Sequence, residues 1–131
     1  MAEETKKTAA PEAAAEDASP LESLFAKVVR KGADPRYDSY SGFQDDGGRK
    51  TGLEEILRAA GARTVLLFGL AVDYGLKATV CDALEAGFGA VVVKDLCRGV
   101  DPASSEAAWA EMEAKGARIW PSLDIERIRE L

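Results

Sequence analysis

The sequence contains no histidine, and only two of its 131 residues, Cys81 and Cys97, are cysteine. Without histidine the chain lacks the commonest general base and the commonest protein ligand of zinc and iron. Two cysteines within a pattern of alternating strands and helices predict reduced thiols in a cytoplasmic protein. No apolar run reaches the ~18 residues that a transmembrane helix needs, and no signal peptide is apparent. We therefore expect no membrane partner and no histidine-based metal site.

Positive charge is also scarce, because 17 lysines and arginines face 23 aspartates and glutamates, which gives a net charge of −6. This excess of negative charge argues against nucleic acid or an anionic membrane surface as a partner. Apolar residues make up 47% of the chain. A chain of this length and composition supports one domain with an α/β core that needs no disulfide or metal.

Residues 1–20 consist mainly of Ala, Glu, Lys, Thr and Pro, and we predict a disordered leader there. The domain is expected over residues 21–131. Its expected strands are residues 25–29, 65–70, 90–96 and 117–120, and helices are expected after Thr51, Ala71–Tyr74, Asp101 and Pro121. Strands that alternate with helices predict parallel βαβ units with right-handed crossovers, and hence an α/β fold.

Two of these helix starts carry a capping signal. Thr51 and Glu54 have the spacing of a capping box, in which each side chain accepts a hydrogen bond from a free backbone N–H group. Asp101 followed by Pro102 is typical of an N-cap and the first position of a helix.

The most informative stretch is residues 64–79, TVLLFGLAVDYGLKAT. Its first half is a short apolar run that suits a strand buried on both faces, and its second half has the apolar spacing of a helix. A buried strand that turns directly into a helix directs free N–H groups into the crevice at the carboxyl end of the sheet. Ligands bind in that crevice in open α/β folds.

Part of this stretch, GLAVDYGLKAT, resembles the nucleophile turn of nicotinamidases in the isochorismatase-like hydrolase superfamily, whose usual form is GLATDYCVKAT. The resemblance runs from about residue 25 to about residue 120. Four further patches carry it in order: Lys31-Gly32, DSYSGF at 38–43, Thr51-Gly52-Leu53, and DLCRGV at 95–100.

The resemblance implies a three-layer open parallel sheet and an amide hydrolase that converts nicotinamide to nicotinate and ammonia. In this family a cysteine attacks the amide, an aspartate from the first strand acts as base, and a lysine supports the charged states. Lys31 matches the lysine, whereas Gly75 occupies the position of the cysteine. We therefore expect a family member that is catalytically incompetent on its own.

The resemblance also implies what this chain leaves out. The family sheet has the order 3-2-1-4-5-6, and the chain matches strands 3 to 6. The first strand with its aspartate has no counterpart, nor has the segment whose aspartate and two histidines hold zinc, iron or manganese. We therefore expect no metal cofactor, and we expect the strand at residues 65–70 to lie at a sheet edge.

The position of this strand at a sheet edge leaves three alternatives open for what pairs with it. The strand at residues 25–29 could shift to pair with it, two copies could share edges as a homo-oligomer, or a complementing chain could supply the missing half. Accordingly, the chain could be a hydrolase completed by a partner chain or a non-catalytic interaction module. Isochorismatases carry glycine where nicotinamidases carry cysteine, so Gly75 fits them too, but their other motifs match this chain less well.

The expected ligand is a nicotinamide-like small molecule, with Tyr40, Phe43, Ala71 and Val72 around its pocket. Tyr40 and Phe43 fit equally well a role in pinning the long loop to the core. Asp73 is expected to cap the helix at Tyr74 rather than to act in catalysis.

The two cysteines are not expected to replace the missing nucleophile. Cys81 lies further along the helix and is expected to pack in the core, as free cysteines commonly do. Cys97 follows a strand end and could face the crevice, but no histidine is present to activate it.

Overall fold

The structure is a computed structural model that describes residues 3–4 and 26–131. From β2 onward strands and helices alternate, which confirms the predicted α/β organisation. The elements are β1 (Glu3–Glu4), β2 (Val29–Arg30), α2 (Leu53–Ala59), β3 (Thr64–Leu70), the π-helix η2 (Val72–Leu76), α3 (Lys77–Glu85), β4 (Gly89–Arg98), α4 (Pro102–Ala114), β5 (Arg118–Trp120) and α5 (Ile125–Arg129).

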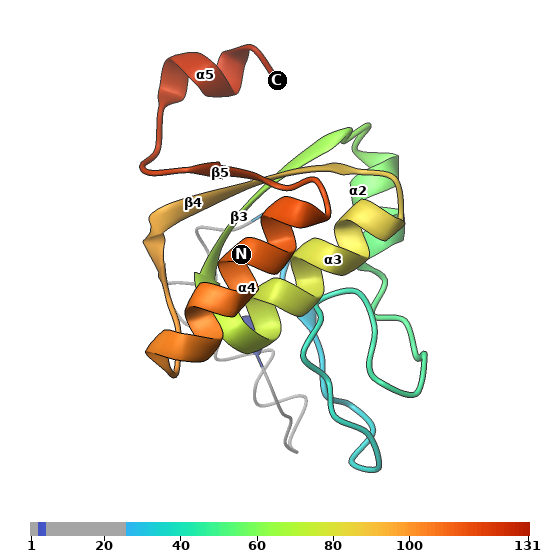
Figure 1. The fold of residues 1–131 in the computed structure, drawn as a ribbon. Helices are drawn as coiled ribbons and strands as arrows, with labels where there is room; N and C mark the ends of the chain where they lie inside the picture. Colours follow the sequence, from blue (N-terminus) through green and yellow to red (C-terminus); the bar gives the residue numbers. More distant parts are fainter. Residues whose placement is uncertain (1–2, 5–25) are drawn as a thin grey trace.

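The central sheet contains β3, β4 and β5 in that order, all parallel. Thr64 lies opposite Gly89 at the start of the β3–β4 pair, and the register shifts between Leu67 and Gly69. Helices α3 and α4 lie side by side against one face of this sheet (Figure 1). None of the helices in the described ranges is both long and apolar enough to cross a bilayer.

The main core lies between the sheet and helices α3 and α4. Its members are at most 5% exposed and come from β3, η2, α3, β4, α4 and the turn before β5: Leu67, Val72, Leu76, Val80, Ala90, Val92, Cys97, Ala108, Met112 and Ala117. Burial of these side chains supplies the main favourable term in folding. The short apolar runs of β3 and β4 and the spacing along α3 therefore formed the layers that the sequence predicted.

A second, smaller core fixes the long loop between β2 and α2. Phe43 is 5% exposed and packs with Ala83 and Phe88, and the Phe43 and Phe88 ring centroids lie 6.3 Å apart. Leu53 and Leu57 of α2 pack against the same cluster. The loop is thus pinned to the core through Phe43, which is one of the two roles that the sequence left open.

The predicted strand at residues 25–29 is mostly wrong. Of the described part, only Val29 is strand, and β2 pairs in parallel with β1 rather than with β3. This ladder is only two residues long because β1 contains only Glu3 and Glu4. The alternative in which this segment shifts to pair with the edge of the central sheet is therefore not realised in the described residues. Residues 5–25, which include most of the expected leader, lie outside the described residues.

The two helix caps differ in outcome. The Asp101 side chain accepts hydrogen bonds from the Ala103 and Ser104 N–H groups at 3.1 Å, which confirms the predicted N-cap of α4.

The prediction of a reciprocal capping box at the start of α2 is wrong. Thr51 Oγ1 accepts a bond from the Leu53 N–H at 3.2 Å, but the Glu54 carboxylate accepts from Arg58 at 3.0 Å. The Thr51 N–H donates to the Phe43 carbonyl instead. The Glu54 carboxylate is therefore not needed at this cap.

Candidate functional site

The turn between β3 and α3 stands at the carboxyl end of the central sheet. The Tyr74 and Leu76 N–H groups both donate to the Ala71 carbonyl, at 3.0 and 2.9 Å, and form the π-helical turn η2. The Leu70–Ala71 peptide bond is cis. Gly75 lies buried inside this turn. The predicted helix therefore begins with a wider turn that carries Gly75 at its inner side.

Lys31, which directly follows β2, extends its side chain to this turn. Its side chain is 7% exposed, and Nζ donates a hydrogen bond of 2.6 Å to the Tyr40 carbonyl. A Cβ built on Gly75 would lie 3.4 Å from Lys31 Nζ and 3.2 Å from the Tyr40 carbonyl oxygen. The structure thus brings together the two residues that the sequence matched to the family lysine and cysteine.

Thr79 holds this arrangement in place and was not predicted as a site residue. Its hydroxyl donates to the Gly75 carbonyl and accepts from the Gly42 N–H, both at 2.8 Å, and the residue is fully buried. One hydroxyl therefore ties the loop that carries Tyr40 to the turn that carries Gly75. Thr79 closes the GLAVDYGLKAT motif, which was the only sequence signal for it.

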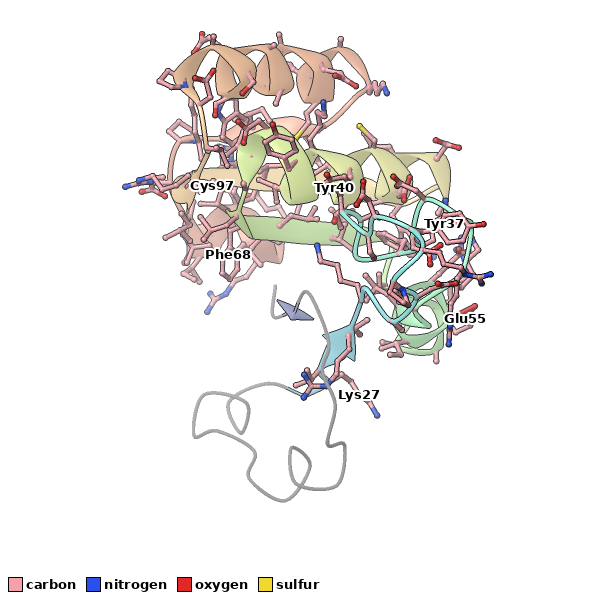
Figure 2. All side chains as sticks on the ribbon, turned by 90° about the horizontal axis from the view of Figure 1, so that it is seen from below. Lys27, Tyr37, Tyr40, Glu55, Phe68 and Cys97 are labelled. Atoms are coloured by element: carbon pink, nitrogen blue, oxygen red, sulfur yellow. The ribbon has the colours of Figure 1, made fainter. Side chains whose placement is uncertain are left out.

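The four residues expected around a ligand occupy different environments. Tyr40, labelled in Figure 2, is 42% exposed. Its ring centroid lies 5.8 Å from that of Tyr74, which belongs to the turn and is 48% exposed, so two exposed aromatic rings lie close together there. Ala71 is half-buried at the start of the turn, whereas Phe43 and Val72 are buried in the two cores. The participation of all four in a ligand pocket stays a prediction.

Asp73 does not cap the helix at Tyr74, as the sequence had suggested. Its carboxylate instead accepts bonds from the N–H groups of Val100 (3.0 Å) and Asp101 (3.1 Å) and from the Ser104 hydroxyl (2.6 Å). The Ser104 hydroxyl, followed by the Val100 N–H, lowers the pKa of Asp73 from 3.8 to about 2. Asp73 therefore fastens the turn to the loop between β4 and α4.

This clamp predicts a pH-dependent contribution to stability. Because the pKa of Asp73 is lower in the folded state, its contribution is complete above about pH 4 and is lost as the pH falls toward 2. Asp73→Asn should unfold at lower urea concentration than wild type at pH 6, and this difference should shrink between pH 4 and pH 2. Asp46→Asn, which makes the same charge change on an exposed loop, is the control. A difference that stays constant over this range would contradict the clamp.

Neither cysteine is placed as a nucleophile. Cys97 is 4% exposed in the main core and its thiol donates to the Val93 carbonyl, so the alternative that it faces the crevice is not realised. Cys81 is only partly buried and lines a polar hollow of about 490 Å³ with Lys77, Glu111 and Lys115, so its predicted core position is wrong. Burial raises the pKa of both thiols, which disfavours the reactive thiolate.

The residues present do not fit the zinc, iron or manganese site that the resemblance implies. The chain has no histidine, and the described residues contain no group of three or more possible ligands that could hold a metal ion. No chemical step is therefore assigned to a metal here.

We accordingly predict that protein purified without a histidine tag retains far less than one equivalent of zinc, iron or manganese. Elemental analysis after dialysis measures this directly, with a zinc-binding protein of known stoichiometry as the control. One equivalent of metal that survives dialysis would reveal a site outside the set of residues considered above.

Comparison with known proteins agrees with the fold. A family model described as "Isochorismatase domain" matches residues 5–122. The nicotinamidase of Escherichia coli is 43% identical over 108 residues, a match that covers 80% of this chain and 51% of the relative. The chain spans about half the length of the curated relatives it matches.

Solved structures give the same picture. PnC1 from L. infantum in complex with nicotinate superposes with a TM-score of 0.68 at 40% identity, over 70% of this chain and 46% of that chain. The yeast nicotinamidase Pnc1p bound to the inhibitor nicotinaldehyde gives a TM-score of 0.72 at 27% identity, over 76% and 48% of the two chains. Sequence and backbone therefore point to the same group of proteins, and they confirm the predicted fold class.

Proposed function

The chain belongs to the isochorismatase-domain family, with nicotinamidases among its relatives, and from this we propose that it is a nicotinamidase-like protein that does not hydrolyse the amide on its own. One observation carries the proposal. The position beside the buried Lys31 ammonium is Gly75, which has no side chain to attack a carbonyl. Nucleophilic amide hydrolysis needs a thiol or hydroxyl at that point and a base within hydrogen-bond reach.

The proposal includes a nicotinamide-like ligand at the carboxyl end of the sheet. Two relatives support it, one solved with nicotinate and the other with the inhibitor nicotinaldehyde. In this chain the Lys31 ammonium and the rings of Tyr40 and Tyr74 stand at the same end of the sheet. A cation suits a carboxylate, and aromatic rings suit a flat pyridine ring.

A cytoplasmic location also belongs to the proposal. It is supported by the two free cysteines, which fit a reducing compartment.

Ligand binding tests this part of the proposal. Because the Lys31 cation favours an acid over an amide, we expect nicotinate to bind more tightly than nicotinamide in calorimetric or NMR titrations. Lys31→Met should weaken nicotinate binding at least about tenfold, the loss expected for one charge-assisted hydrogen bond. Lys77→Met, which removes a partly exposed lysine that pairs with Glu111, is the matched control. Equal weakening by both variants, or no binding of either compound, would show that the ligand has been wrongly assigned.

A further inference from the structure

The Thr79 hydroxyl in α3 bonds two parts of the chain that are far apart in sequence. It donates to the Gly75 carbonyl and accepts from the Gly42 N–H, both at 2.8 Å, and Thr79 is fully buried. A bond from a threonine hydroxyl to the carbonyl four residues earlier is common in helices and needs no special role. The bond from Gly42 is different, because it comes from a loop residue 37 positions away that helix geometry does not bring to α3.

The loop bonded in this way also carries the contact that holds Lys31. The carbonyl of Tyr40, two residues before Gly42, accepts a hydrogen bond of 2.6 Å from the Lys31 ammonium. Ser41, between them, is 6% exposed, and its hydroxyl accepts from the Phe43 N–H at 3.0 Å. This short segment is therefore held tightly, and a shift of Gly42 is passed on to the Tyr40 carbonyl and to Lys31 Nζ.

These contacts form a closed ring that returns to residue 75. Lys31 Nζ and the Tyr40 carbonyl oxygen lie 3.4 and 3.2 Å from a Cβ built on Gly75. The Thr79 hydroxyl completes the ring, since it bonds the turn on one side and the loop on the other. The interaction between two charges depends on their separation, and it is stronger in a buried setting than in water. The hydroxyl thus sets the distance over which the charge of Lys31 acts at residue 75.

We propose that Thr79 is a positioning residue, whose hydroxyl places the Lys31 ammonium against residue 75 and thereby sets how strongly this site favours an anionic group over a neutral one. The proposal rests on the proposed function in one respect, which is that the anion is the carboxylate of a nicotinate-like ligand. The positioning is independent of any ligand, because it is measured on a thiol introduced at residue 75.

The test measures the thiol pKa of Gly75→Cys, from the pH dependence of alkylation, with and without a second change. Thr79→Val keeps the shape of the side chain and removes the hydroxyl, whereas Thr79→Ser keeps the hydroxyl. Thr51→Val is the control, because Thr51 Oγ1 donates to the Gly42 carbonyl at 2.6 Å and its loss frees the same glycine on the side of α2. Urea unfolding reports the stability that each variant loses.

We expect Thr79→Val to raise the thiol pKa by at least about half a unit, and Thr79→Ser and Thr51→Val to leave it within about 0.2 units. A merely structural role would raise the pKa equally in both valine variants. In the wild-type chain, Thr79→Val should lower the ratio of nicotinate to nicotinamide affinity at least about threefold, the fold-change that corresponds to half a pKa unit. Thr79→Ala, which also removes the hydroxyl and leaves room for the loop to relax, replaces Thr79→Val in every comparison if the valine variant does not fold.

Three results would overturn the proposal. They are an unchanged thiol pKa in Thr79→Val, an equal rise in Thr51→Val, and an ordinary thiol pKa in Gly75→Cys with Thr79 intact, since there is then no coupling to set. Failure of nicotinate to bind the wild-type chain counts against the proposed ligand instead, and the thiol pKa still decides the role of Thr79.

Discussion

The purified chain, assayed alone, is expected to release no ammonia from nicotinamide above the buffer blank. The position beside Lys31 carries no nucleophile because residue 75 is glycine. Neither thiol replaces it, since Cys97 is buried in the core and Cys81 lies in a separate polar hollow. Loss of the nucleophile from a catalytic unit costs on the order of 10⁶ in kcat, so the remaining rate falls below detection.

The assay is a coupled measurement of ammonia, with E. coli nicotinamidase as the positive control. Because a trace of host nicotinamidase would imitate weak activity, the chain is produced in a host that lacks this enzyme. Turnover that persists through repurification and is abolished by Lys31→Met would show that this chain is an active hydrolase.

Gly75→Cys is expected to create a reactive thiol without creating an amidase. A Cβ at this position lies 3.4 Å from Lys31 Nζ, and the positive charge of the lysine favours the thiolate. The Tyr40 carbonyl, at 3.2 Å, must yield by a few tenths of an ångström. We expect alkylation about tenfold faster at pH 7 than at Cys81 or Cys97, because burial raises the pKa of both natural thiols.

Turnover needs more than this thiol. The leaving amine must receive a proton and a water must then be activated. Among the described residues, the three atoms nearest to a Cβ at residue 75 are two backbone carbonyl oxygens and Lys31 Nζ, and none of them belongs to a carboxylate or a histidine. Gly75→Ser, which adds a side chain of similar size without a thiol, controls for the steric change, and peptide mapping identifies the alkylated site. If the introduced thiol reacts no faster than Cys97, then the side chain of residue 75 is not activated by Lys31 or is not accessible to the alkylating reagent. Amide hydrolysis by the single variant would show that a base has been overlooked.

The layers of the fold could be predicted because they depend on local signals. The apolar runs of β3 and β4 and the Asp101–Pro102 pair act within a few residues, and each formed a strand or helix where one was expected. The expectation that β3 is buried on both faces is wrong, because Leu67 is its only buried residue. The proximity of Lys31 and Gly75 could be predicted only from the family resemblance, because no periodicity links residues so far apart in the sequence. The predictions of these strands and this helix from short-range pattern therefore held, whereas the reciprocal capping box at Thr51 and Glu54, which is also a short-range pattern, did not form.

The errors at Asp73 and Cys81 share a physical cause, which is competition from partners distant in sequence. Asp73 has an ordinary capping position, but Val100, Asp101 and Ser104 offer its carboxylate three donors from another loop. Cys81 is next to the buried Val80 on α3, yet it lines the same polar hollow as Lys115 and Glu111.

The same competition explains the sites that the sequence left open or missed. Thr79 could not be identified because its role depends on the loop at Gly42. The sequence left two roles open for Phe43, and the structure decides between them because Phe43 packs against Phe88 in the smaller core. The chemistry of a side chain could be predicted from the sequence, but its partner could not.

The placement of Gly75 beside Lys31 is tested most directly by the thiol pKa of Gly75→Cys, measured from the pH dependence of alkylation with and without Lys31→Met. If the two residues are neighbours, the thiol pKa of the single variant lies below the usual value of about 8.5 and rises when the lysine is removed. Lys77→Met in the same background should leave the pKa unchanged. An identical thiol pKa with and without Lys31 would contradict the proposal that this turn corresponds to the nucleophile turn of the family.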